Sequence, residues 1–358
     1  MSAPAEDQAP IPWAVLDQFI RVCARAVGLS EQDVDLLAVA LVKADLRGVD
    51  SHGCSRLPAY ARALQRRIIN PRPTLAVVHS RGATEVIDGD NSLGAITGQT
   101  AMIRATELAA DSGVGVVSVR NCNHAGMLAA HVTRASDRSM IGFFVSNTPA
   151  IMAPWGGRDA LLGNGPIAYA IPRKADLPPI ILDMATSATN RGRIREYAES
   201  GHAIPDGWAL DDNGTPTTDP AAALLGALMP AGGHKGYGLA FVNEILAGLL
   251  SGASLGVEMP RDFLREGSTT LDSWGSGHMA VAFNIVAFGD RDRFLERLEQ
   301  FAASVKSSRL AAGSTEILLP GEMEHRTSVA RLKEGIPLKP GTRRRLSELA
   351  TELGISAI

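Results

Sequence analysis

The chain is poor in cysteine, in aromatic side chains and in net charge. Its three cysteines, Cys23, Cys54 and Cys122, lie far apart and form no CxxC pair. This spacing argues against a disulfide scaffold and a structural zinc site, and it predicts a reduced, cytoplasmic protein. The formal net charge is only -3 over 358 residues. We therefore expect no nucleic-acid partner, because nucleic-acid binding needs a basic surface.

Long apolar runs and a secretion signal are also missing. The apolar run from Leu239 to Leu250 is interrupted by Asn243 and Glu244, and it is too short to span a bilayer. The segment from Met1 to Pro12 is polar and rich in proline, without the basic and apolar regions of a signal peptide. We therefore expect no membrane partner.

The usual nucleotide-binding fingerprints are absent too. The nearest match to G-x-G-x-x-G begins at Gly113, but it lacks the third glycine and leads into a strand instead of a helix. There is no P-loop either. A nicotinamide cofactor, if one binds, must therefore be held by a fold other than the Rossmann fold.

The length allows two domains or one large one, and the order of elements predicts an α/β (α+β) fold. We expect a helical segment over 1–72 that forms part of the substrate site, and a strand-helix segment over 73–120. A cofactor-binding domain over 121–290 and a C-terminal return to the first domain over 291–358 follow.

Helices are predicted over 13–27, 31–46 (with Ser30 as N-cap), 51–67, 96–111, 125–136, 221–228, 236–251 and 290–307. Strands are predicted over 75–78, 84–88, 114–119, 141–145, 180–183 and 279–287.

The stretch from Ser51 to Tyr60 carries the strongest chemical signal. It places His52, Arg56 and Tyr60 four residues apart, so a helix would present all three side chains on one face. Histidine titrates near neutral pH, and a guanidinium group matches a carboxylate. The pattern suits a substrate with a carboxylate beside a carbonyl, although an ordinary amphipathic helix capped by Ser51 would look the same.

Three further segments could hold a ligand. Asn123-His124 lies at a predicted strand-to-helix junction, where backbone amides can bind phosphate, and Asp183 lies at a strand end. The segment from Gly232 to Gly238 opens a helix, so its amides and Lys235 could hold a pyrophosphate. Taken singly, His124 could be a structural histidine and Asp183 a helix cap. The glycines around His234 have few structural explanations, and we expect a ligand there.

Together these motifs resemble the type-2 malate/L-lactate dehydrogenase family. The resemblance covers most of the chain and rests on motifs in the family's order: Arg47-Gly48-Val49-Asp50-Ser51-His52-Gly53, Asn123-His124-Ala125-Gly126, Ala153-Pro154-Trp155-Gly156-Gly157-Arg158, Leu182-Asp183-Met184-Ala185-Thr186-Ser187, Pro216-Thr217-Thr218-Asp219-Pro220, Gly232-Gly233-His234-Lys235-Gly236-Tyr237-Gly238 and Leu319-Pro320-Gly321-Glu322. It implies a non-Rossmann, predominantly antiparallel sheet, NAD or NADP as cofactor, and a homodimer. The implied partner is a small carboxylic acid, either a 2-oxo or 2-hydroxy acid or, in one branch, a cyclic 2-imino acid.

The resemblance also implies roles for individual residues. His52 is the expected acid/base, with His124 as the alternative. Ser51 or Asp183 is expected to orient His52, Arg56 to hold the substrate carboxylate, and Tyr60 to support the pocket. The expected cofactor-binding residues are His124, Ser146, Asp183, Met184, Ala185, His234, Lys235, Gly236, Pro320, Gly321 and Glu322.

We therefore expect an NAD(P)H-dependent oxidoreductase that transfers hydride between nicotinamide and C2 of a small 2-oxo or 2-hydroxy acid. Reduction of a C=N bond in a cyclic imino acid is the nearest alternative. A metal-dependent hydrolase would need ligands from among His52, His124, His234, Asp183 and Glu322, but no HExxH or similar spacing is present, and no metal is predicted. A non-catalytic binding protein on the same scaffold is the remaining alternative. The sequence leaves the particular acid and the choice between NAD and NADP open.

Overall fold

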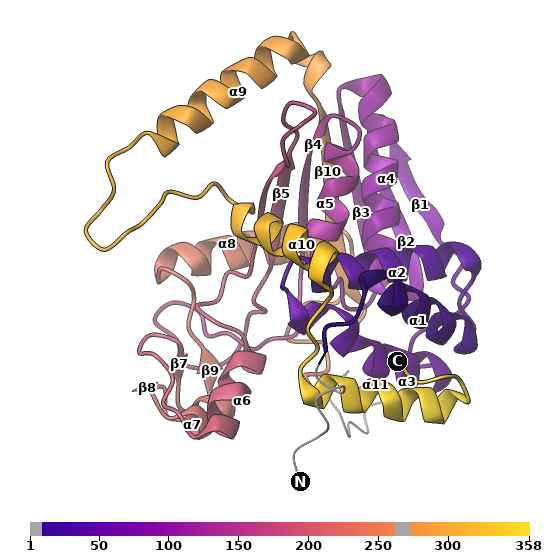
Figure 1. Ribbon diagram of the computed structural model, residues 1–358, viewed down its shortest axis with the longest axis vertical. Coiled ribbons are helices and arrows are strands. Elements are labelled where there is room, and N and C mark those ends of the chain that lie inside the picture. Colours follow the sequence, from indigo (N-terminus) through magenta and orange to yellow (C-terminus); the bar gives the residue numbers. More distant parts are fainter. Residues whose placement is uncertain (1–8, 262–272) are drawn as a thin grey trace.

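A seven-stranded sheet forms the centre of the computed structural model, which describes residues 9–261 and 273–358 (Figure 1). Neighbouring strands are antiparallel except for the second and third, which are parallel. The predicted mixed fold with a mostly antiparallel, non-Rossmann sheet is thus confirmed. Across the sheet the strands are β1 (Ala76–Arg81), β2 (Thr84–Ser92), β3 (Val114–Cys122), β10 (Ser276–Asn284), β4 (Met140–Ser146), β5 (Ile167–Ile171) and β6 (Ile180–Met184).

Strand β10 shows how the sheet is covered. It lies between β3 and β4, and its residues are buried until the last two. Helices α4 (Gly94–Ser112) and α5 (Ala129–Ser136) pack on the sheet, as does a π-helical turn over Ile245–Leu249 that contacts β10, β3 and β4. The central strand is therefore covered on both faces, which explains its run of small and apolar residues.

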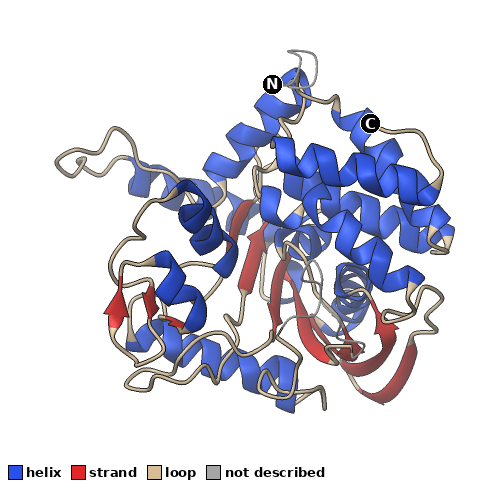
Figure 2. Ribbon diagram, turned by 90° about the horizontal axis from the view of Figure 1, so that it is seen from below, coloured by secondary structure: helices blue, strands red, loops and turns tan. Residues whose placement is uncertain are grey.

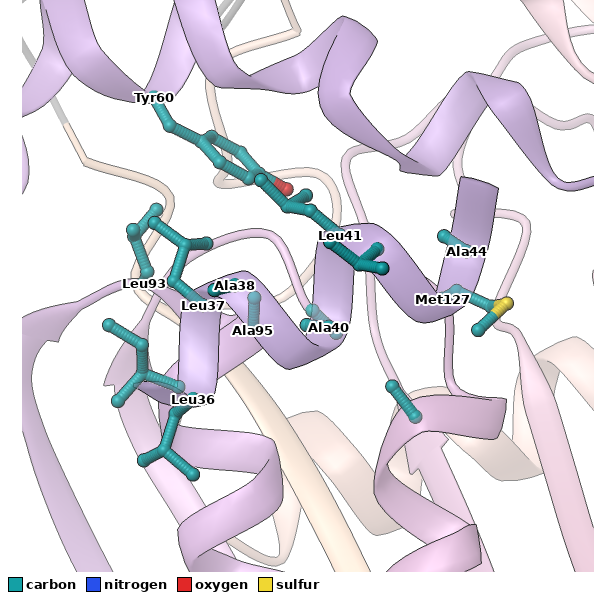
Figure 3. Close-up of a cluster of buried hydrophobic side chains, with 14 of the residues drawn as sticks. Leu36, Leu37, Ala38, Ala40, Leu41, Ala44, Tyr60, Leu93, Ala95 and Met127 are labelled. Carbon is teal, nitrogen blue, oxygen red and sulfur yellow. The ribbon is translucent and has the colours of Figure 1, made fainter. Parts of the chain in front are cut away.

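A group of helices lies beside the sheet (Figures 1 and 2). It consists of α1 (Trp13–Ala26), α2 (Glu31–Leu46), α3 (Leu57–Gln65) and α11 (Pro340–Leu353). Ser30 caps α2 as predicted, since its Oγ accepts a hydrogen bond from the Asp33 amide at 3.2 Å. Figure 3 shows Leu37 and Leu41 of α2 in a buried apolar cluster that also contains Tyr60 of α3.

The remaining elements form a smaller lobe and two outlying helices (Figure 1). The lobe has a three-stranded sheet with α6 (Arg191–Ser200) and α7 (Pro220–Leu225), and α8 (His234–Glu244) leads from it into the π-helical turn. Helix α9 (Arg291–Lys306) stands away from the sheet, and α10 (Glu322–Glu334) brings the chain back to the helical group. Across the small sheet the strands are β8 (Pro216–Thr217), β7 (Ala209–Leu210) and β9 (Ala227–Leu228). Three 3-10 turns lie elsewhere in the described chain: η2 (Asp50–His52), η3 (Cys54–Arg56) and η5 (Ile285–Ala287).

The continuous helix predicted from Ser51 is wrong. Residues 50–56 form two separate 3-10 turns, and Gly53 between them is extended, with φ -90° and ψ -146°. The reason is tertiary: Asp45 Oδ2 accepts a hydrogen bond from the Cys54 amide at 2.7 Å. A Cβ atom at residue 53 would lie only 1.9 Å from Asp45 Oδ1, so only glycine fits beneath this carboxylate. His52 and Arg56 therefore do not share a helix face with Tyr60.

Several helices and strands begin or end at other residues than predicted. The helix expected from residue 125 begins at Ala129, and that expected over 221–228 ends at Leu225 before β9. The helix expected over 236–251 begins at His234 and becomes π-helical after Glu244. The strand expected over 279–287 spans Ser276–Asn284, and a 3-10 turn follows it.

The predicted division into segments stays a prediction. The main sheet takes strands from both sides of the 120/121 boundary, and β3 runs across that boundary. At the C-terminal end, α11 contacts α1 and α3 of the helical group. In the described ranges, no helix combines the length and the apolar character needed to cross a bilayer.

Candidate active site

One edge of the main sheet gathers most of the expected site segments. Strands β3, β4 and β6 end at this edge, while β5 and β10 begin there, because Cys122 pairs with Ser276, His278 with Ser146, and Ile167 with both Val145 and Met184. The residues just beyond these ends therefore lie along the same edge. They are His124 after β3, Ser146 at the end of β4, Asp183 to Ala185 at β6, and Trp274 before β10.

Two histidines from different segments stack at this edge. The His52 and His124 rings have centroids 5.4 Å apart and planes inclined by 26°. His52 Nδ1 lies 2.9 Å from Ser51 Oγ, and His124 Nδ1 lies 2.6 Å from the Tyr60 hydroxyl. The Trp274 ring meets His124 edge-on, with centroids 5.6 Å apart. Thus four predicted site residues and one unpredicted tryptophan come together.

The hydrogen bonds assign the tautomer of His124. Burial raises the pKa of the Tyr60 phenol to about 12, so its hydroxyl stays protonated and donates to Nδ1. The remaining ring proton of neutral His124 must then be on Nε2. The Ser51 hydroxyl oxygen can instead accept a hydrogen bond from Nδ1–H of His52, which leaves Nε2 of His52 as a proton acceptor.

Both histidines are held neutral. Burial and, to a smaller extent, the positive charge of Arg56 lower the pKa of His52 to about 3. Burial also places the pKa of His124 well below its ordinary value, with Arg56 and His52 contributing in the same direction. A neutral imidazole is ready to accept a proton, whereas it must first gain one to act as a strong acid.

Arg56 supplies the positive charge beside the two rings. Its Nε donates to the Ser51 carbonyl oxygen at 2.7 Å, which fixes the side chain against the turn that carries His52. Its two terminal nitrogens make no hydrogen bond to any residue of the described chain. A half-buried guanidinium with free terminal donors is suited to a carboxylate.

The Asp183 carboxylate has a hydrogen-bond partner on α5. Its Oδ2 accepts a hydrogen bond from the Ala129 amide at 2.7 Å, at the first residue of α5. Its side chain is exposed, yet the surrounding protein raises its pKa to about 6. Of the two neighbours expected to orient His52, Ser51 is the one that contacts the ring. The α5 amide expected to be free for phosphate is occupied by this carboxylate.

The expected cofactor segments converge on β6. The Ile181 amide donates to the Pro320 carbonyl at 3.1 Å, which brings 320–322 against the strand. Beyond the strand, the Ala231 amide donates to the Thr186 carbonyl at 2.8 Å. A Cβ at residue 236 would lie 2.3 Å from the Ala231 oxygen, so the start of α8 docks closely here only because that residue is glycine. Residues 183–185, 234–236 and 320–322 thus come together.

The first turn of α8 has the chemistry that a dinucleotide requires. Its N-cap, Gly233, offers no side-chain cap, and the turn contains no acidic residue. His234 and Lys235 are both exposed. The Gly236 amide donates to the Ala231 carbonyl at 3.0 Å, so the amides of His234 and Lys235 are the ones that can face a ligand. Amides at a helix N-terminus, together with a lysine, favour phosphate oxygens, so these residues fit a pyrophosphate-containing cofactor.

Two of the expected cofactor residues already have protein partners. Ser146 is 2 % exposed, and its Oγ lies 2.9 Å from Nδ1 of His278. The Glu322 carboxylate pairs with Lys306 at 2.7 Å and Arg326 at 3.2 Å and accepts the Leu319 amide, which lowers its pKa to about 2. Both side chains therefore shape the backbone around the cofactor segments.

Sequence reasoning missed Trp274 and its support. The Trp274 amide donates to Asn123 Oδ1 at 3.1 Å, and the Asn123 side-chain amide donates to the carbonyls of Asn91 and Ser92. Asn123 is fully buried and holds Trp274 beside His124. A tryptophan directly before a glycine-rich strand start was the available signal, but nothing local indicates that it faces a histidine far away in sequence. No group of three or more potential metal ligands occurs in the described part of the chain.

Comparison with known proteins identifies the family. The family model for malate/L-lactate dehydrogenase matches residues 11–347. The L-sulfolactate dehydrogenase of Methanocaldococcus jannaschii is 39% identical over 329 residues, covering 92% of this chain and 93% of the relative. The malate dehydrogenase of Pyrococcus horikoshii is 34% identical and covers 99% and 98%. The (2R)-3-sulfolactate dehydrogenase (NADP(+)) of Chromohalobacter salexigens is 34% identical and covers 84% and 86%.

Solved structures agree with this assignment. The sulfolactate dehydrogenase structure from Methanocaldococcus jannaschii superposes with a TM-score of 0.89 at 37% identity, covering 97% of this chain and 98% of that one. The structure of delta1-piperideine-2-carboxylate reductase from Pseudomonas syringae pathovar tomato gives a TM-score of 0.83 at 26% identity, covering 95% and 99%. The chain therefore belongs to the malate/L-lactate dehydrogenase family and is an NAD(P)-dependent oxidoreductase of 2-hydroxy acids.

Proposed function

We propose that the substrate of this enzyme binds and reacts beside the stacked rings of His52 and His124, and that Arg56 holds the substrate carboxylate. The supporting observation is that a cationic group with free donors lies beside two neutral imidazoles, each with Nδ1 bonded to a hydroxyl. The nicotinamide cofactor, when bound, supplies or accepts the hydride at C2. The protein residues orient the acid and move the proton.

The carboxylate of the acid binds the terminal nitrogens of Arg56. A guanidinium group makes two parallel hydrogen bonds to a carboxylate, so it fixes rotation as well as position. This orientation determines which face of C2 is presented for hydride transfer. Tyr60 and Trp274 form neighbouring walls, because both rings contact His124.

The proton moves through His52. In the oxidation direction, the neutral ring keeps its own proton on Nδ1, donated to Ser51 Oγ, and accepts the proton of the 2-hydroxyl group at Nε2. In the reduction direction, a carboxylate bound at Arg56 offsets the electrostatic contribution to the lowered pKa of His52, which adds to the larger contribution of burial. The ring can then take up a proton and deliver it to the developing alkoxide. His124, held by Tyr60, is the alternative proton carrier.

The cofactor segments are proposed to be residues 183–185, 234–236 and 320–322, together with Ser146 and His124. Their convergence on β6 and the absence of a side-chain cap and of an acidic residue in the first turn of α8 support this assignment. His234 and Lys235 would hold phosphate oxygens. The choice between NAD and NADP is left to measurement.

The substrate class is a small 2-oxo or 2-hydroxy carboxylic acid. Reduction of a cyclic 2-imino acid is a second candidate, supported by the likeness to the Pseudomonas reductase. A panel of oxaloacetate, pyruvate, sulfopyruvate and piperideine-2-carboxylate, each with NADH and with NADPH, separates these activities when nicotinamide absorbance is followed. Turnover of the imino acid alone would reject the 2-oxo acid assignment.

We also propose a homodimer. A row of large apolar side chains on α8 and the turn after it is exposed; we call it the α8 apolar face. Monomeric proteins rarely expose a contiguous apolar patch of this kind. Because α8 begins at His234, a second copy on this face would lie near the proposed cofactor segment. The face consists of Leu239, Phe241, Val242, Ile245, Leu249 and Leu250.

A cytoplasmic location is proposed from the cysteines. Cys23, Cys54 and Cys122 are all free and buried. Separate unpaired thiols are typical of a reducing compartment. Fractionation of cells that express a tagged chain tests this location.

A further inference from the structure

The turn that carries His52 is held from the far end of another helix. We call residues 47–56 the His52 loop. Arg331 of α10 donates from Nη1 to the Asp45 carbonyl oxygen at 2.5 Å and to Asp50 Oδ1 at 2.6 Å. Asp45 lies near the end of α2, and Asp50 begins the 3-10 turn that ends at His52. One guanidinium nitrogen thus bridges the entry to the loop and the turn that carries the histidine.

Helix α10 also approaches the start of the His52 loop closely. Gly48 has φ +79°, and a Cβ there would lie 3.1 Å from Thr327 Cγ2, one helical turn before Arg331. The Arg331 side chain is only 15% exposed, against 39% for Asp50. A pair shielded in this way is less weakened by solvent than a fully exposed surface pair.

The other end of α10 lies at the proposed cofactor segment. The helix begins at Glu322, directly after Pro320 and Gly321, and the Pro320 carbonyl is bonded to β6. Glu322 to Arg331 spans about 14 Å at 1.5 Å per residue. Helix α10 (Figure 1) therefore connects residues 320–322 to the His52 loop.

We infer that Arg331 is a positioning residue: through the Asp45 carbonyl and the Asp50 carboxylate it holds the His52 loop in register with the cofactor segment at 320–322. This inference rests on the proposed function of His52 and Arg56. Neither Arg331 nor Asp50 needs to touch the substrate. Because the loop carries both the proton carrier and the carboxylate clamp, its displacement should impair reaction of the acid and leave cofactor binding intact.

The test compares Arg331→Met with Arg331→Lys, Asp50→Asn and the matched control Lys333→Met, which removes an exposed cation from the same helix. Misplacement of a reacting group by about 1 Å can lower rates about 100-fold, so we expect Arg331→Met to lower kcat/KM for the acid by about 10- to 100-fold. The dissociation constant of the reduced nicotinamide cofactor, followed by its fluorescence, should change by less than about twofold. Arg331→Lys should recover part of the loss because it keeps a positive charge facing the Asp50 carboxylate. Asp50→Asn should show a smaller loss. Lys333→Met should behave as wild type.

A double variant separates positioning from general stability. Arg331→Met added to His52→Gln should lower kcat little further, since both changes act on kcat through His52, while the displaced Arg56 should still raise KM. Full additivity in kcat, or wild-type kcat/KM for Arg331→Met while His52→Gln is inactive, would overturn the inference and leave the proposed function standing. Wild-type turnover of His52→Gln would instead reject the proposed function. Activity is referred to the folded fraction measured by thermal unfolding, so that a destabilised variant still gives a decisive result.

Discussion

The imidazole rings of His52 and His124 stack with centroids 5.4 Å apart, and each has a hydroxyl partner at Nδ1. The two rings come from different parts of the fold, one from the turn before α3 and the other from the segment after β3. Arg56 lowers the pKa of both, in addition to the effect of burial. The pair therefore offers two neutral proton carriers to one substrate oxygen, and only functional tests separate them.

Replacing each histidine separately identifies the proton carrier. His52→Gln should lower kcat by roughly 10²- to 10⁴-fold, the usual contribution of a positioned acid or base, while cofactor binding is retained. His124→Gln should have a smaller effect on kcat. Steady-state rates combined with fluorescence titration of the cofactor measure both quantities. Near-normal turnover of His52→Gln with loss in His124→Gln would transfer the role to His124.

Arg56 should control both acid binding and pH dependence. Arg56→Lys should raise KM for the acid, because a point charge cannot replace the two-pronged guanidinium. Arg56→Gln removes the charge that adds to burial in lowering the pKa of His52. The pKa should therefore rise, so that kcat/KM for oxidation is lost at a higher pH on acidification. Arg56→Lys retains the charge, so its kcat/KM for oxidation should be lost at the same acidic pH as in wild type. If both variants lose kcat/KM at the same pH, this electrostatic role is contradicted.

Asp45 should make stability fall as pH rises. Burial raises its pKa from 3.8 to about 7, so between these values the folded state holds a proton that the unfolded state has lost. By linkage, the free energy of unfolding then decreases from about pH 4 to about pH 7. Asp45→Asn removes this dependence and should gain stability relative to wild type over that range. Denaturant unfolding of both proteins at several pH values measures the difference, and a constant difference would show that Asp45 does not titrate there.

The α8 apolar face should be required for self-association. Leu250→Glu introduces a charge into a side chain that is 61% exposed on this face, and it should shift the protein toward a monomer. Leu225→Glu changes another exposed leucine, on α7, and serves as the matched control. Size-exclusion chromatography with light scattering gives the mass of each variant. A wild-type monomer, or an unchanged dimer for Leu250→Glu, would reject the proposed interface.

The comparison of sequence with structure shows where local reasoning is sufficient. The helix from Glu31 with its Ser30 cap was predicted because its signal lies in adjacent residues. The helix expected from Ser51 was wrong because the Asp45 carboxylate, in a neighbouring element, occupies the space beneath Gly53. Asp183 was expected, as an alternative to Ser51, to orient His52; its carboxylate accepts the Ala129 amide, a partner that no spacing in the sequence indicates.

The amino-acid sequence by itself determined the alternation of strands and helices, the absence of a Rossmann fingerprint and the set of motifs that identifies the family. These properties depend on residues close to one another along the chain. Only the tertiary structure decided that His52 stacks on His124, that Tyr60 and Trp274 contact His124, and that Arg331 holds the His52 loop. The physical reason is that such contacts depend on strand order and helix packing, which bring distant side chains within bonding distance, and residue spacing carries no information about them.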